Sequence, residues 1–178
     1  HSFGGKVALE VARRDPGGLR QVWVVDSIPD RREPGGDAWR MLDVLRAHRG
    51  PFGDREEAIR AVTSEGYPRP VGEWMATNLA ERDDGLRWGL NLDGIEALME
   101  DFFRVDLWGV VERPPEGVEI HVVKAEDSSV LSEEACRRVE RAGEENGRTR
   151  LHRLEGGHWL NVSNPDGLID LLSRRLPR

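Results

Sequence analysis

The sequence predicts an α/β fold, in which helices flank a mostly parallel sheet and a helical segment interrupts it. Three observations support this fold class. A helical pattern at residues 4–13 leads into a short apolar run at residues 21–25, which is half of a strand–helix–strand crossover. Sheet character then disappears over residues 30–111 and returns at residues 118–123. A helix, a strand and a closing helix follow, so that strands and helices alternate on both sides of the interruption.

The first helix and the first strand differ in hydrophobic period. Between residues 4 and 13, apolar residues recur with helical spacing until Asp-Pro-Gly-Gly at residues 15–18 ends the pattern. Residues 21–25, Gln-Val-Trp-Val-Val, form a continuous apolar run instead. We expect this strand to be buried on both faces of a parallel sheet.

The middle of the sequence reads as a helical insertion. Breakers of the Gly, Pro or Asp type separate its predicted helices, and nothing between them has the pattern of a buried strand. The predicted helices are residues 37–48, 54–64, 70–80 and 91–104. We therefore expect a sheet domain at residues 1–30 and 111–178, incomplete because its N-terminal strands are absent, and a helical lid at residues 31–110.

The last part of the sequence returns to strand–helix alternation. The run Val118–Val123 predicts a strand, and residues 132–142 predict a helix that begins with a capping serine. Residues 149–154 alternate as a strand does. A closing helix is predicted with Asn164 as its N-cap and Pro165 at its first position.

The sequence His1-Ser2-Phe3-Gly4-Gly5 has the composition of a nucleophile elbow. It matches the last four positions of Gly-x-Ser-x-Gly and runs directly into a helix, with the first Gly expected just before His1. Small neighbours allow the sharp strand-to-helix turn that exposes such a serine. The positive N-terminal end of the following helix favours an oxyanion there. Ser2 is therefore the candidate nucleophile.

His158 is the candidate general base. It lies in Gly156-Gly157-His158-Trp159, a Gly-rich loop after the last predicted strand, where the histidine of a serine-nucleophile triad belongs. The other histidines are assigned structural roles. His121 and His152 fall in predicted strands and His48 in a polar helix of the insertion, whereas His1 adjoins Ser2 but neighbouring side chains usually diverge.

The sequence resembles the α/β-hydrolase superfamily, and within it the small esterase or acyl-hydrolase branch. The resemblance is carried by His-Ser-Phe-Gly-Gly-Lys, Val-Val-Asp-Ser-Ile-Pro and Glu-Gly-Gly-His-Trp-Leu-Asn-Val-Ser-Asn-Pro. It covers nearly the whole chain, as a C-terminal portion that starts at the elbow. It implies a lid inserted in the sheet domain and a catalytic acid that completes the triad.

The position of that acid differs from the usual pattern. In most members of the superfamily the acid follows the penultimate strand, where this chain has Ser128, with Asp127 one residue away. Some look-alikes carry it after the strand that follows the elbow, and here that residue is Asp26. Catalytic groups of open α/β sheets gather at the carboxyl ends of strands. We favour Asp26, with Asp127 as the alternative and Asp93 as a more distant one.

The resemblance supplies half of an oxyanion hole. One donor is expected to be the backbone N–H of Phe3, the residue after the nucleophile. The second comes from a loop earlier in the fold, and that loop is absent from this sequence. Loss of one donor typically lowers the rate by about 10²-fold or more. We therefore expect this chain to be inactive by itself, and to be continuous with or paired to a missing N-terminal half.

Composition excludes several other classes. The formal net charge is −7 with both signs interspersed, so nucleic-acid binding has little electrostatic support. The single cysteine, Cys136, forms no internal disulfide and fits a reducing intracellular compartment. No apolar run is long enough for a transmembrane segment. The spacings typical of metal sites and phosphate loops are missing, so we expect neither a metal nor a cofactor.

The sequence thus predicts a serine hydrolase that cleaves a carboxylic ester or thioester of a small molecule through an acyl-enzyme. Ser2 is the expected nucleophile, His158 the base, Asp26 the acid and Phe3 the oxyanion donor. One alternative uses the same triad for C–C bond or lactone hydrolysis. Another, favoured by Ser128 in the usual acid position, is a non-catalytic protein of the same fold that binds a ligand or partner.

Overall fold

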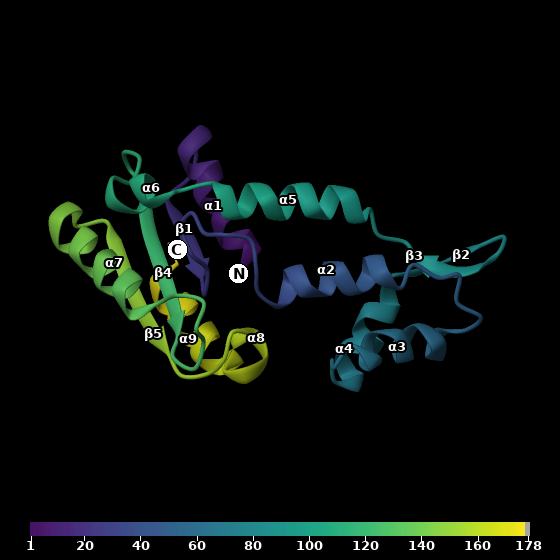
Figure 1. Ribbon diagram of the computed structural model, residues 1–178. Coiled ribbons are helices and arrows are strands. Elements are labelled where there is room, and N and C mark those ends of the chain that lie inside the picture. Colours follow the sequence, from purple (N-terminus) through teal and green to yellow (C-terminus); the bar gives the residue numbers. More distant parts are fainter. Residues whose placement is uncertain (177–178) are drawn as a thin grey trace. The chain divides into compact units, whose positions relative to one another are not determined.

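The computed structural model of the protein describes residues 1–176. Its central sheet consists of three parallel strands in the order β1–β4–β5 (Figure 1). Strand β1 covers Gln21–Val25, β4 covers Glu119–Ala125 and β5 covers Thr149–Leu154. A parallel sheet whose strands are connected through helices is an α/β architecture, so the predicted fold class is confirmed.

Helices cover both faces of this sheet, as the continuous apolar strands require. Helix α1 (Phe3–Arg14) packs on the face that carries Val24. Its approach is close, because a Cβ atom on Gly5 would lie 3.1 Å from Val24 Cγ1. The opposite face carries Val123, which packs against the C-terminal helices α8 (Leu160–Ser163) and α9 (Pro165–Arg175).

Two further helices complete the sheet domain. Helix α7 (Glu133–Asn146) packs on β5 and on the short helix α6 (Trp108–Glu112). The capping residues predicted for α7 are in place, since the Ser132 side chain accepts a hydrogen bond from the backbone N–H of Ala135. Helix α6 was not predicted, because its five residues are too few to show a helical period.

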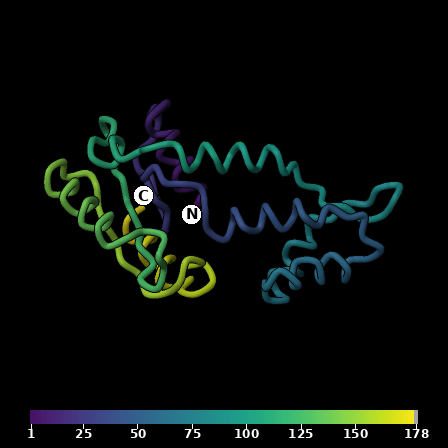
Figure 2. The backbone as a smooth tube through the Cα atoms, viewed as in Figure 1, coloured from purple at the N-terminus to yellow at the C-terminus, as the bar shows by residue number. Residues whose placement is uncertain are grey.

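The chain divides into two compact units. Unit 1 consists of residues 1–31 and the residues from Arg104 onward, and unit 2 consists of residues 32–103. The backbone can be followed out of unit 1 after β1 and back into it before α6 (Figure 2). Within unit 1 these two connections are joined, because the backbone N–H of Leu107 donates to the carbonyl of Pro29 at 2.9 Å.

Unit 2 is built from four helices and a small hairpin. In chain order the helices are α2 (Asp37–Ala47), α3 (Arg55–Ser64), α4 (Arg69–Met75) and α5 (Leu92–Arg104), with a 3₁₀ turn η1 (Ala76–Asn78) after α4. Its core is a cluster of buried apolar residues drawn from these elements and the hairpin. They are Val44, Leu45, Phe52, Ala58, Val62, Met75 and Trp88.

The hairpin corrects the expectation that residues 70–80 are helical throughout, and it adds two short strands to an insertion that was expected to consist of helices. Strands β2 (Leu79–Arg82) and β3 (Gly85–Trp88) pair antiparallel. Apart from the buried Trp88, their residues are half-buried or exposed, so the strands lack the apolar run of a buried strand. Their pairing depends on Gly85, whose φ is +126°, and on a bridge from Leu86 to Phe52. These tertiary features leave little trace in local sequence.

Candidate active site

Ser2 lies on a strained turn immediately before α1. Its φ is +51° and its ψ is −124°, a conformation that L-residues rarely adopt. The backbone is held there because the N–H of Ser2 donates to the carbonyl of Val25 at 3.0 Å. Close packing behind the turn requires glycine at position 5, where a Cβ atom would lie 2.6 Å from Ser27 Cβ. This is the backbone geometry of a nucleophile elbow.

Asp26 follows the last residue of β1 and is fully buried. Its φ is +41°, so it is the second non-glycine residue in the described chain with a positive φ. Its backbone N–H donates to the carbonyl of Val123 at 2.8 Å. Its Oδ1 accepts a hydrogen bond from the N–H of Ala125 at 3.2 Å. The carboxylate is therefore fixed at the carboxyl end of two neighbouring parallel strands.

His158 contacts both residues. It lies in the loop between β5 and α8, and its side chain is 27% exposed. Its Nδ1 is 2.7 Å from Asp26 Oδ2, and its Nε2 is 3.1 Å from Ser2 Oγ. A carboxylate can only accept, so the proton lies on Nδ1, and Nε2 is left to accept from the Ser2 hydroxyl.

This arrangement has a definite chemical capacity. The hydroxyl of Ser2 faces an unprotonated ring nitrogen that can take its proton. A carboxylate in the position of Asp26 can hold the ring in that tautomer and can stabilise an imidazolium formed by proton transfer. Phe3 begins α1 directly after Ser2, at the positive end of the helix dipole.

Within the described part of unit 1, the structure does not bring the alternative acid Asp127 to His158. Asp127 is exposed; its backbone N–H donates to the carbonyl of Gly156, and no contact described within residues 1–176 joins its carboxylate to His158. Ser128, which has the usual acid position, accepts from the N–H of Val130 through its hydroxyl. The turn that carries both is held by the buried Lys124, whose ammonium donates to the Ser128 carbonyl at 2.5 Å.

The remaining candidates are engaged elsewhere. Asp93 pairs with Arg46 inside unit 2, at 2.9 Å between Oδ1 and Nη2. His48, also in unit 2, is 2.8 Å from Glu65 Oε1 through its Nε2. His121 and His152 contact each other on the sheet, where burial lowers the pKa of both imidazoles.

Sequence reasoning missed the contact that His1 makes. The Nε2 of His1 lies 2.7 Å from the backbone carbonyl oxygen of His158. The His1 ring also lies against the ring of His158, with 4.6 Å between centroids. Its position beside Ser2 was visible in the sequence. The direction of its side chain was not, because that direction depends on the strained backbone of the turn.

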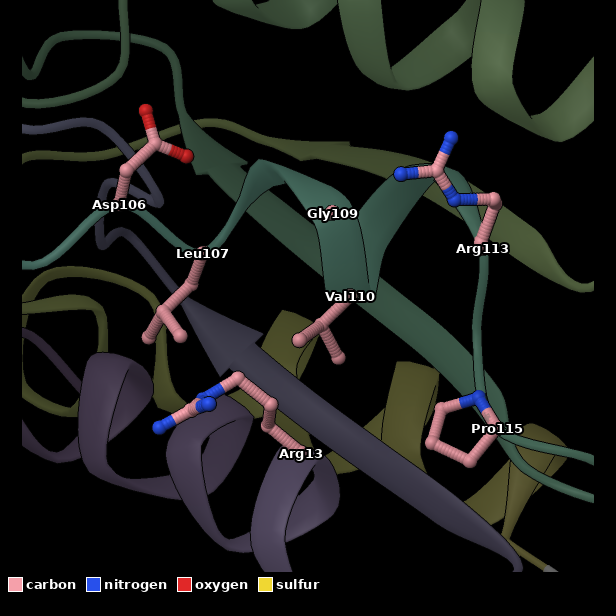
Figure 3. Close-up of a pocket in the computed structure, with 7 residues that line it drawn as sticks. All are labelled: Arg13, Asp106, Leu107, Gly109, Val110, Arg113 and Pro115. Atoms are coloured by element: carbon pink, nitrogen blue, oxygen red, sulfur yellow. The ribbon is translucent and has the colours of Figure 1, made fainter.

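A surface hollow lies at the other end of α1, away from Ser2. It has a volume of about 240 Å³ and is lined from α1 by Arg13 and otherwise by residues 106–115 (Figure 3). None of the candidate residues lines it. Within residues 1–176, no helix is long and apolar enough to cross a membrane, and no three acidic, His or Cys side chains form a group suited to a metal ion.

The sequence profile described as the alpha/beta hydrolase family matches residues 1–171. The chain belongs to this family. A curated relative is the Danio rerio protein named sn-1-specific diacylglycerol lipase ABHD11, which is 27% identical over 109 residues. The match covers 57% of this chain and 33% of that protein, so the chain spans about a third of the length of the relative.

Solved structures of α/β hydrolases share the fold. A marine microorganism esterase has a TM-score of 0.77 at 21% identity, with 99% of this chain and 68% of that chain covered. E-2-(acetamidomethylene)succinate hydrolase has a TM-score of 0.65 at 19% identity, with 98% and 63% covered. The α/β-hydrolase family and fold predicted from the sequence are therefore confirmed, and family membership supports a hydrolase.

Proposed function

We propose that this chain carries the catalytic triad of a serine hydrolase that cleaves a carboxylic ester or thioester through an acyl-enzyme. One observation carries the proposal: His158 contacts Asp26 Oδ2 at 2.7 Å and Ser2 Oγ at 3.1 Å with its two ring nitrogens. Ser2 is the nucleophile, His158 the general base and Asp26 the residue that orients it. The three side chains thus form one hydrogen-bonded chain, in which the proton moves only between Ser2 and His158.

In acylation, Ser2 Oγ attacks the carbonyl carbon of the substrate while its proton moves to His158 Nε2. The carbonyl oxygen gains negative charge, which the backbone N–H of Phe3 and the N-terminus of α1 stabilise. Collapse of the tetrahedral intermediate expels the alcohol or thiol, which receives the proton from His158. Ser2 is left as an ester of the acyl group.

Deacylation repeats these steps with water. His158 Nε2 accepts a proton from a water molecule as its oxygen attacks the acyl carbon, and then returns that proton to Ser2 Oγ when the carboxylic acid leaves. Asp26 stays ionised throughout and stabilises the imidazolium at both stages. The cycle consumes water and needs no cofactor.

The substrate class rests on chemistry and on the relative. A serine–histidine pair acts on activated carbonyl carbon, and the Danio rerio relative is named as a lipase for one position of diacylglycerol. This supports a small-molecule acyl ester. We also propose that unit 2, residues 32–103, which makes up most of the expected lid at residues 31–110, forms a helical lid. The two connections of unit 2 to unit 1 are joined by the hydrogen bond from the N–H of Leu107 to the carbonyl of Pro29, three residues after Asp26 in the chain.

The test is labelling of the full-length natural protein with a fluorophosphonate, read as intact mass and by peptide mapping. We expect one adduct, on Ser2, and hydrolysis of short-chain aryl esters. Ser2→Ala should abolish both. Ser173→Ala, at an exposed position of α9, is the matched control and should leave both unchanged.

Two outcomes contradict the proposal. Labelling or ester hydrolysis that persists in Ser2→Ala would move the nucleophile elsewhere. A folded natural protein that neither reacts with the probe nor turns over esters and thioesters would favour the non-catalytic alternative. A third outcome would revise only the substrate class: if the protein hydrolysed lactones or diketones but not esters, the triad would stand and the substrate would be of another type.

A further inference from the structure

We propose that His1 is a positioning residue, which holds the His158 loop against the nucleophile turn. This inference rests on the proposed roles of Ser2 and His158. His1 is adjacent to Ser2 in the chain, yet its side chain bonds the backbone of His158 while the Ser2 side chain bonds the ring of the same residue. Ser2 therefore contacts the ring of the proposed base, and His1 contacts its backbone carbonyl.

The hydrogen bond from His1 has a fixed direction. A carbonyl oxygen only accepts, so His1 Nε2 carries a proton and donates it to His158 O at 2.7 Å. The neutral ring does this in one tautomer, and the protonated ring does it as well. Protonation of the His1 ring therefore leaves the bond in place, and the bond is suited to a constant mechanical role.

The loop that carries His158 is held firmly up to Gly156 and less closely at Gly157. A Cβ atom on Gly156 would lie 2.6 Å from Ser163 Oγ, whereas one on Gly157 would meet nothing within 4 Å. The Gly157 carbonyl accepts from the Ser163 hydroxyl at 3.5 Å, which is long for a hydrogen bond. The carbonyls of residues 155 and 156 are held by Asn164 and Asp127. Among the contacts described within residues 1–176, the donor to the His158 carbonyl is His1.

Ring contacts reinforce the bond. The His1 centroid is 4.6 Å from that of His158 and 5.1 Å from that of Trp159. The centroids of the His158 and Trp159 rings are 5.5 Å apart, and the ring planes make an angle of 69°. Trp159 is 55% exposed, so this three-ring cluster lies at the surface rather than in the core. The cluster therefore orders the site locally and adds little to the stability of the fold.

Proton transfer from Ser2 to His158 depends on the position of the His158 ring, which the loop determines. The Ser2 Oγ to His158 Nε2 distance is 3.1 Å, and a displacement of about 1 Å at a reacting group lowers a rate by about 10²-fold. Without the His1 bond, the loop can shift while Asp26 still holds Nδ1. We therefore expect the chemical step to slow, while substrate binding changes little.

The test compares His1→Gln with His1→Met and His1→Phe in the full-length natural protein. Gln and Met have similar lengths, but only Gln donates a hydrogen bond, whereas Phe keeps the ring contacts without a donor. The readouts are kcat and KM with an aryl ester, the rate of fluorophosphonate labelling at Ser2, and Tm. We expect His1→Met and His1→Phe to lower kcat and the labelling rate by about tenfold or more. KM should stay within about twofold, and His1→Gln should restore most of the rate.

Other results overturn the inference. Equal rates in the Gln and Met variants would show that the donor has no role, as would an unchanged kcat in all three. A loss of rate that follows Tm would show a structural role instead. These outcomes are separable from failure of the proposed function. That failure would show as labelling or activity that persists in Ser2→Ala, or as an unsubstituted protein that shows neither.

Discussion

The carboxylate of Asp26 and the imidazole of His158 lie 2.7 Å apart although 132 positions separate them. The register of the sheet explains how Asp26 reaches this place. Val25 pairs with Val123 across β1 and β4, so Asp26 extends beside the turn that follows β4. Its side chain accepts from the N–H of Ala125, the last residue of β4. Asp26, at the end of β1, therefore lies beside the end of β4. The turn after β4 has Ser128 at the position where most family members carry the acid.

Asp26→Asn should lower kcat on the order of 10³- to 10⁴-fold with KM little changed. The amide has the same shape and can still accept from Ala125, so the fold should persist. It can also donate, however, and so favours the wrong tautomer of His158. Steady-state kinetics with a Tm control measures this effect. Asp127→Asn is the matched control and should retain full activity, since the Asp127 side chain is exposed.

The reverse result would assign the acid differently. If Asp127→Asn lost activity while Asp26→Asn kept it, the turn after β4 would have to approach His158 in the working enzyme. Equal, small effects from both substitutions would mean that His158 needs no carboxylate. The 2.7 Å contact would then serve folding rather than catalysis.

Gly5→Ala should destabilise the protein, whereas Gly4→Ala should not. A Cβ atom at position 5 would lie 2.6 Å from Ser27 Cβ, which the β1 loop cannot easily move, whereas one at position 4 meets nothing within 4 Å. Such overpacking costs about 1–3 kcal/mol. An alanine at position 4 should be neutral or stabilise α1 by up to about 1 kcal/mol. Denaturant unfolding of the pair measures the difference, and equal midpoints would refute it.

Local sequence predicted the sheet domain well because its signals are short in range. The apolar run at residues 21–25 coincides with β1, and the expected helix at residues 4–13 lies inside α1. Asn164 caps α9 as expected, since its side chain accepts from the N–H of Gly167. Each of these features depends on neighbours within a few positions. The structure also brings Ser2, Asp26 and His158 together, and their catalytic roles remain predictions.

Features that depend on distant contacts were not visible in the sequence. The hairpin of β2 and β3 requires the bridge between Phe52 and Leu86. The contact of His1 with His158 spans 157 positions and requires the positive φ of Ser2. Neither leaves a periodic pattern. Both depend on where the fold places a second segment, and one chain without relatives to compare does not show this.

Ser27→Ala should leave stability unchanged or raise it by about 1 kcal/mol. The hydroxyl of Ser27 is buried and has no hydrogen-bond partner among the described residues, so its removal relieves an unpaired polar atom. Ser132→Ala is the contrasting variant, because Ser132 caps α7 through the N–H of Ala135. Its loss should cost about 1 kcal/mol. Equilibrium unfolding of both variants tests the pair, and a destabilised Ser27→Ala would reveal a partner for that hydroxyl.

The pair of His121 and His152 should make stability depend on pH. Glu119 accepts from His121 Nε2 at 3.3 Å, so neutral His121 presents an unprotonated Nδ1 to His152 Nε2 at 2.9 Å. Trp23 stacks on His121, 4.2 Å between centroids, and shields the pair. Burial lowers the pKa of His121. Burial also lowers the pKa of His152, and repulsion from a protonated His121 adds to this, so that the pKa of His152 is about 4. Arg150 and Arg175 also disfavour protonation of both rings.

The direction of the effect follows from the number of protons that the folded and unfolded states bind at each pH. An unfolded histidine titrates near 6.5, whereas folded His152 titrates at about 4, so between these values the unfolded chain holds more protons. The contribution of His152 to stability is therefore fully present above about pH 6.5 and is lost as the pH falls toward 4. Tm measured from pH 7 to pH 4 should fall, and His152→Gln should reduce the slope of that fall. An equal slope in the variant would contradict this role, because the lost stability would then arise from groups other than the pair.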